Sequence, residues 1–266
     1  MIAAALTAVS CNEIRIEEPV KYGTLSISLA GEPSVDVVTK TDGALSSEQA
    51  AGYNIAVYNN AECTGSPVFG PKEYSSLGSE PIVLAKGNYY VWAESCLPSD
   101  AEKDNGCVRL EGKSETPVQV KAGLAANASV TCYVANAKIS VTFDASVAGH
   151  FVDGTLKVKL SRENPVRESS ASYDKEAQNK GNEDFWFNSG SVVKYEISGK
   201  SVLTQETVKK SGTIQGTGEN NALASKDYII INVKASTTSG VLKLESMFEG
   251  TNIGQSNVDA PFNPYN

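Results

Sequence analysis

Apolar and polar residues alternate through most of this chain. In residues 23–31 (GTLSISLAG), three apolar side chains alternate with hydroxyl-bearing ones. The same period of two recurs in residues 53–60, 116–123, 138–144, 154–161, 227–235 and 240–246. Because successive side chains of a strand point to opposite faces, this pattern predicts half-buried strands. Gly, Asn, Pro and Ser clusters separate the segments, as turns require. We therefore expect an all-β chain of antiparallel, Ig-like β-sandwiches.

The chain is long enough for two such sandwiches. It has 266 residues, of which 41% are hydrophobic and 20% charged, as in ordinary globular proteins. Domains of about 100 to 200 residues are typical, which favours two of them here. A short segment of small and polar residues, 135–137, joins two strand-like runs. We therefore expect one sandwich over 22–134 and another over 135–266, preceded by a leader and tether over 1–21.

The net charge excludes two classes of partner. The chain carries 23 Lys and Arg against 31 Asp and Glu, a formal charge of -8. Binding to nucleic acid requires clustered basic residues that neutralise phosphates. An anionic membrane surface would also repel this chain. We expect no nucleic-acid partner.

The N-terminal segment has the pattern of an export signal. A short apolar run, Ile2–Val9, is followed by the small residue Ser10 and then by Cys11. This segment resembles a bacterial lipoprotein signal. The resemblance implies that the Cys11 thiol is acylated, for example with palmitate, and that Cys11 becomes the new N-terminus. The alternative is a frayed terminus with an accidental cysteine.

The segment after the cysteine, residues 12–21, is acidic and lacks apolar periodicity, which is typical of a tether. It resembles the acidic flank of surface-exported lipoproteins from Gram-negative gut anaerobes. That resemblance implies an outer-membrane lipid anchor, at the cell surface rather than in the periplasmic leaflet. The lipid on Cys11 would make the membrane a partner of this protein.

One strand in the first half carries a family resemblance. In KGNYYVWAES, Gly87 stands two residues before Tyr89, as in a strand of the fimbrillin-like surface lipoproteins. The surrounding segments resemble that family in their order: GTLSISL, YNIAVYN, GNYYVWA, LEGKSETPVQVKAG and TCYVANAKISVTF. The resemblance implies two transthyretin-like β-sandwiches in tandem and a cell-surface role in adhesion or pilus assembly.

The resemblance also implies a mode of assembly. Related pilus subunits lose a first strand by cleavage after a basic residue and then accept a strand from the next subunit. Here Lys40 is the first basic residue after the GTLSISL segment, so processing that releases this strand would occur there.

Catalytic patterns are missing from the sequence. There is one histidine, His150, so an HExxH zinc helix is impossible, and no GxSxG elbow presents a nucleophile. The two GKS triplets lack the earlier glycine of a phosphate-binding loop. In residues 99–106 (SDAEKDNG), Asn105 occupies the position where a calcium loop requires glycine, and no glutamate closes the loop. We interpret this segment as a solvated acidic hairpin tip. We therefore expect that the protein is not an enzyme and that it binds no cofactor and no metal ion.

Exposed aromatic residues could bind a glycan or a protein partner. In residues 88–94, Tyr90 and Trp92 share one strand face, opposite the expected core face of Tyr89, Val91 and Ala93. In residues 185–187, Trp186 lies opposite its two phenylalanine neighbours. Trp186, Trp92 and Tyr90 are therefore candidate binding residues, with burial or interdomain packing as the alternative.

The other cysteines suggest at most one disulfide. Cys132 alternates with valines, which predicts a buried, reduced thiol. Cys96 and Cys107 bracket a ten-residue loop, and export would permit a disulfide between them. The sequence leaves open whether this pair is oxidised or reduced.

Two functional hypotheses follow. The first is a non-catalytic surface lipoprotein that acts as a pilus anchor, tip subunit or adhesin, with other fimbrial subunits or a host ligand as partners. The second is a glycan-binding surface lipoprotein of an uptake system.

Overall fold

The computed structural model describes residues 21–31, 43–44, 50–78, 80–174, 183–238, 241–252 and 255–260. For residues 31, 43–44 and those from 237 onward it describes the backbone alone. In this part of the chain the regular elements are β-strands and short 3-10 helices, which confirms the predicted all-β class. No helix within it has the length and apolar character needed to span a bilayer.

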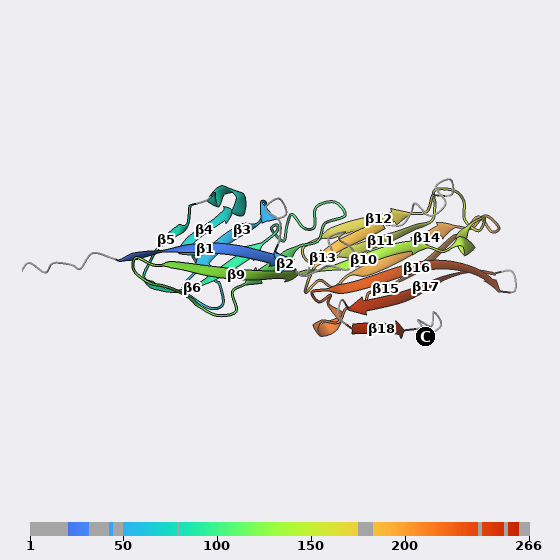
Figure 1. The fold of residues 1–266 in the computed structure, drawn as a ribbon. Coiled ribbons are helices and arrows are strands. Elements are labelled where there is room, and N and C mark those ends of the chain that lie inside the picture. Colours follow the sequence, from blue (N-terminus) through green and yellow to red (C-terminus); the bar gives the residue numbers. More distant parts are fainter. Residues whose placement is uncertain are drawn as a thin grey trace, which may run out of the picture.

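The first nine strands form an N-terminal unit, which ends at residue 134 (Figure 1). They are β1 (Tyr22–Gly31), β2 (Gly43–Ala44), β3 (Asn54–Tyr58), β4 (Phe69–Glu73), β5 (Ile82–Ala85), β6 (Gly87–Glu94), β7 (Leu110–Lys113), β8 (Val118–Val120) and β9 (Ala125–Val134). Hydrogen bonds connect them in the order β2-β1-β9-β7-β6-β3-β4, with β5 beside β1 and β8 beside β6. A 3-10 helix, η1 (Tyr74–Leu77), follows β4.

Strand β9 belongs to both layers of this unit. Residues 125–132 pair with β1, whereas residues 133–134 pair with β7. The layers enclose a cluster of buried side chains to which β1 contributes Leu25 and Leu29. The phenol of Tyr74 adds a cross-connection by donating to the backbone oxygen of Ile27 at 2.9 Å. The first strand is therefore an integral part of the core.

The remaining nine strands form a C-terminal unit, which begins at residue 136. They are β10 (Asn136–Phe143), β11 (Lys157–Arg162), β12 (Arg167–Ser172), β13 (Glu183–Asn188), β14 (Lys194–Lys200), β15 (Thr207–Thr213), β16 (Asp227–Thr238), β17 (Val241–Asn252) and β18 (Gln255–Ala260). Two sheets result, in the orders β13-β10-β16-β17-β18 and β12-β11-β14-β15. The 3-10 helices η2 (Ala145–Val147) and η3 (Glu219–Asn221) lie in connections.

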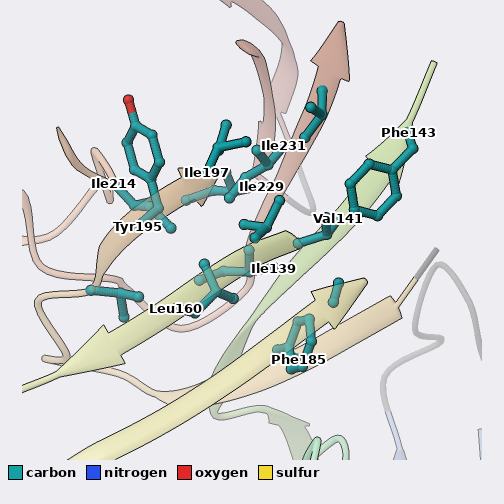
Figure 2. Packing of buried hydrophobic residues seen from close by; sticks show 14 of the residues in the cluster. Ile139, Val141, Phe143, Leu160, Phe185, Tyr195, Ile197, Ile214, Ile229 and Ile231 are labelled. Carbon is teal, nitrogen blue, oxygen red and sulfur yellow. The ribbon is translucent and has the colours of Figure 1, made fainter. Parts of the chain in front are cut away.

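The two sheets of the C-terminal unit face each other across an apolar core (Figure 2). One sheet contributes Ile139, Val141, Phe185 and Ile231, all fully buried, and the other contributes Leu160 and Ile197. Each fully buried side chain of this size stabilises the fold by about 1.5–3 kcal/mol. This packing is that of the predicted β-sandwich.

Two strand pairings depart from the antiparallel expectation. β1 runs parallel to β9, and β10 runs parallel to β16. A parallel pair requires a long crossover between its strands, and here the intervening strands of each unit supply it. In both units, therefore, the first strand lies beside a late strand, and in the N-terminal unit β1 also pairs with β2 at its end.

The two units lie end to end and have separate cores (Figure 1). No described strand before residue 135 pairs with one after it. β9 ends at Val134 and β10 begins at Asn136, where the sequence predicted a boundary. That residues 22–134 and 135–266 are independent domains stays a prediction.

Candidate binding surfaces

Strand β6 presents the expected faces. Tyr89, Val91 and Ala93 are buried, whereas Tyr90 and Trp92 are half-buried on the outer face, which confirms the predicted alternation. Tyr90 stands opposite Tyr58 of β3. These rings form an aromatic surface on the N-terminal unit.

Strand β13 presents Trp186 on the outer face of the C-terminal unit. Its neighbours Phe185 and Phe187 are fully buried, while Trp186 is half-buried, as the alternation predicted. In the ladder, Lys138 of β10 stands between Trp186 and Tyr228 of β16. The Lys138 ammonium lies 6.0 Å from the centroid of the Trp186 ring and 4.8 Å from that of Tyr228, within cation–π range.

Polar groups complete this surface. The Asp184 carboxylate forms an ion pair with the Lys138 ammonium at 2.9 Å, and it accepts a hydrogen bond from the Ser140 hydroxyl. The same hydroxyl lies 3.3 Å from the phenolic oxygen of Tyr228. We define Trp186, Lys138, Tyr228, Asp184 and Ser140 as the Trp186 surface. Lys138 and Ser140 are themselves buried, so the members that a ligand could reach are the half-buried rings of Trp186 and Tyr228 and the exposed Asp184. Such a combination suits a ligand that is apolar on one face and polar at its rim.

Trp186 also lies at the junction of the two units. Its backbone N–H donates to the backbone oxygen of Asn105 at 2.8 Å. A Cβ added to Gly106 would come within 2.9 Å of the Trp186 Cβ, so these two residues are in close contact. Packing at the junction of the units therefore applies to Trp186, and its role in binding stays a prediction. Trp92 and Tyr90, on the other unit, form a separate surface.

The interpretation of residues 99–106 as a solvated hairpin tip is correct for only part of the segment, since Ser99 and residues 103–105 are exposed. Ala101 is fully buried, and the Glu102 side chain is only 10% exposed. Glu102 forms an ion pair with Arg162 of the C-terminal unit at 2.6 Å. The charged composition of the segment suggested solvation, but its buried partner lies 60 residues away and left no local signal.

Arg109 and Glu94 form a buried ion pair at the base of the same segment, which the sequence did not predict. Arg109 donates to a Glu94 carboxylate oxygen at 2.9 Å and to the backbone oxygen of Cys96 at 3.2 Å. Its backbone N–H donates to the Asn136 side chain, which in turn donates to the backbone oxygen of Cys107. No local sequence signal marks this pair, because β6 alternation places Glu94 outward, where a charge is ordinary, whereas the structure buries it.

The cysteines match one expectation and leave the other open. Cys132 is fully buried, and burial raises the pKa of its thiol to about 12, which confirms the predicted inert thiol. Cys96 and Cys107 are free thiols that lie close enough to hydrogen-bond. Burial, followed by the charge of Cys107, raises the pKa of Cys96 to about 11. The question that the sequence left open, whether this pair can be oxidised to a disulfide, is untested.

A family model matches nearly the whole chain. It covers residues 21–259 and is described as a domain of unknown function, DUF4493. The chain belongs to the DUF4493 family. No curated protein matches this DUF4493 chain significantly.

Two solved structures resemble the DUF4493 chain in structure at low sequence identity. The fimbrial anchor protein Mfa2 from Porphyromonas gingivalis is 9% identical, with a TM-score of 0.45 over 86% of this chain and 98% of that one. A fimbrial assembly protein from Parabacteroides distasonis is 13% identical, with a TM-score of 0.44 over 90% of this chain and 98% of that one.

The structure does not describe two of the site residues predicted for the DUF4493 chain. Cys11 and Lys40 lie outside the described residues. Within the described part, no group of three or more His, Cys, Asp or Glu side chains is placed to hold a metal ion. His150 is half-buried and takes part in a turn, where its backbone oxygen accepts the N–H of Val202 at 2.9 Å.

Proposed function

We propose that this DUF4493 chain is a non-catalytic lipoprotein of the outer-membrane surface that acts as a pilus anchor or tip subunit, or as an adhesin. The place of β1 in the core is the observation that supports this proposal most. A chain whose first strand completes its own sandwich offers no vacant groove to a neighbouring subunit. Such a chain can end a polymer or bind alone, but it does not extend a polymer.

The contacts of β1 support this role in detail. It pairs with β9 over eight residues, from Thr24 to Gly31, and with β5 over four, from Tyr22 to Leu25. Leu25 is fully buried and Leu29 nearly so. At about 1.5–3 kcal/mol for each such side chain, these contacts hold the strand firmly in place.

We expect limited trypsin treatment to leave the protein monomeric. Cleavage at Lys40 would cut the chain after β1, but the ladders to β9 and β5 would retain the strand. Light scattering after size exclusion measures the mass, and mass spectrometry shows whether residues 22–31 remain bound. A Lys40→Gln variant is the control for the cut. Ladders of higher mass that appear only when Lys40 is cleaved would identify a polymerising subunit instead.

Lipid anchoring through Cys11 is the second part of the proposal. We expect the protein to incorporate labelled palmitate and to partition into detergent, and Cys11→Ser to abolish both. One acyl chain gives only marginal membrane binding at about 0.8 kcal/mol per buried CH₂, so stable anchoring requires several chains on this cysteine. Cys63→Ser is the matched control, because it removes a different thiol, one that lies within the described part of the chain. Labelling that survives Cys11→Ser would refute the anchor.

A glycan-binding lipoprotein is the second candidate function, and the Trp186 surface favours it. If it is correct, we expect sugar binding with nanomolar to micromolar affinity on a glycan array, because a Trp ring contributes a large stacking area. Trp186→Ala should abolish this binding, whereas Trp92→Ala, on the other unit, should not. Complete absence of sugar binding by the intact protein would exclude this function.

A further inference from the structure

The segment between β6 and β7 leaves the N-terminal unit and lies on the C-terminal unit. We call residues 97–107 the strap. Its own turns are fixed by backbone hydrogen bonds, including that from the N–H of Cys107 to the oxygen of Ala101 at 2.9 Å. Gly106 has a φ of +83°, a conformation that favours glycine. The strap is therefore a formed element rather than an open loop.

Glu102 attaches the tip of the strap. Its two carboxylate oxygens accept from the two terminal nitrogens of Arg162 at 2.6 and 2.8 Å, a bidentate pair. The backbone N–H of Asn188 donates to the same carboxylate at 2.7 Å, and Arg167 lies 3.7 Å away. Burial raises the pKa of Glu102, but these hydrogen bonds and charges outweigh it and hold the pKa below its usual range.

Arg162 is prepared for this contact by its own unit. It is almost fully buried, and it also donates to the Ser191 hydroxyl at 2.8 Å and to the backbone oxygen of Pro165 at 2.9 Å. A buried guanidinium without a carboxylate is costly. Glu102 is the carboxylate that neutralises it.

The strap also occupies the outer edge of β13. This strand ends its sheet and pairs only with β10 among the described strands. Its outward N–H groups donate to the strap instead: that of Trp186 to Asn105 at 2.8 Å, and that of Asn188 to Glu102. The Asn188 side chain donates to the backbone oxygen of Pro98 at 3.1 Å.

Arg167 closes the edge further. One of its terminal nitrogens donates to the backbone oxygen of Trp186, and the other donates to that of Asp104 at 2.9 Å. An open strand edge is a template for pairing with other chains, and proteins often cover such edges with loops. Here the covering loop comes from the other unit of the same chain.

The base of the strap is attached to the C-terminal unit as well. Asn136, the first residue of β10, is fully buried. It accepts from the backbone N–H of Arg109 at 3.1 Å and donates to the backbone oxygen of Cys107 at 2.8 Å. Residues of the C-terminal unit thus hold the strap at its tip, through Glu102, and at its base, through Cys107.

We propose that the strap is a latch that locks the two units into one rigid body and closes the β13 edge, with Glu102 as its holding residue. This device is independent of the anchor, adhesin or glycan-binding role proposed above. The tip contact with Arg162 depends on the Glu102 side chain, so one substitution there removes this contact.

Amide exchange in the full chain, followed by NMR, tests the latch. We expect Glu102→Ala to speed exchange at the Trp186 and Asn188 amides at least tenfold. Phe185 and Phe187, whose N–H groups point toward β10 by strand alternation, should change less than twofold. Asp100→Ala is the matched control, because Asp100 lies in the same strap and pairs only with the exposed Lys103.

A second variant opens the strap without removing a charge. A Cβ at position 106 would lie 2.6 Å from the backbone oxygen of Ala101, so Gly106→Ala should give the same exchange pattern. In both variants we expect X-ray scattering in solution to show a broader range of inter-unit arrangements than in the wild type. Unchanged Trp186 and Asn188 exchange, equal acceleration at Phe185 and Phe187, or unchanged scattering would each overturn the latch.

Discussion

Replacing Leu25 with aspartate is expected to unfold the N-terminal unit and to leave the C-terminal unit folded. Leu25 is fully buried and pairs in register with Ala126 of β9 and Ile82 of β5. The substitution removes about 1.5–3 kcal/mol of apolar burial. It also places a charge in an apolar core, at a further cost of several kcal/mol. Together these losses approach the total stability of a small domain, about 5–15 kcal/mol.

The two tryptophans make this outcome measurable, because Trp92 reports on one unit and Trp186 on the other. In single-tryptophan backgrounds, Leu25→Asp should shift the Trp92 emission to that of an exposed indole. The Trp186 emission should shift less, because Trp186 loses only its contacts with the strap. Ser26→Asp is the control, since Ser26 is exposed on the same strand. Simultaneous loss of both signals would mean that the two cores fold as one.

Replacing Arg109 with methionine is expected to destabilise the protein by about 3–5 kcal/mol near neutral pH, because a buried carboxylate loses its partner. The side chains of Arg109 and Glu94 are 9% and 5% exposed. Methionine retains most of the apolar contacts of the arginine stem but supplies no charge. The loss should therefore come mainly from the uncompensated Glu94.

This destabilisation should depend on pH. Burial raises the pKa of Glu94, the hydrogen bond and charge of Arg109 lower it, and the charge of Glu111 raises it. Removing Arg109 leaves only the raising effects. A carboxyl whose folded pKa exceeds its unfolded value contributes stability below the unfolded pKa and loses it as pH rises through the folded pKa. The deficit of Arg109→Met should accordingly be smaller near pH 4.5 than near pH 7.

Urea unfolding of Arg109→Met at both pH values measures this difference. Glu94→Gln combined with Arg109→Met is the matched variant, because it removes the charge that the single change leaves buried. We expect the double variant to recover part of the lost stability near pH 7 and to show little pH dependence. An equal deficit for the single variant at both pH values would contradict the role assigned to Glu94.

Local pattern in the sequence determined the all-β class and the buried face of individual strands. Tyr89, Val91 and Ala93 face the core as their alternation predicted, and so do Phe185 and Phe187. This works because side-chain direction along a strand is set by the backbone itself, with a period of two, whatever the neighbouring strands are. Cys132 was correctly placed for the same reason.

Strand neighbours and buried charges were decided only by the tertiary structure. The parallel pairing of β1 with β9 joins residues about a hundred positions apart, and alternation does not specify which strand lies beside which. The charged residues around Glu102 are typical of a solvated turn, and the Glu102 side chain is buried because Arg162 and the β13 edge supply partners from the other unit. Burial of a charge depends on a partner that neutralises it, and such a partner can come from any part of the chain.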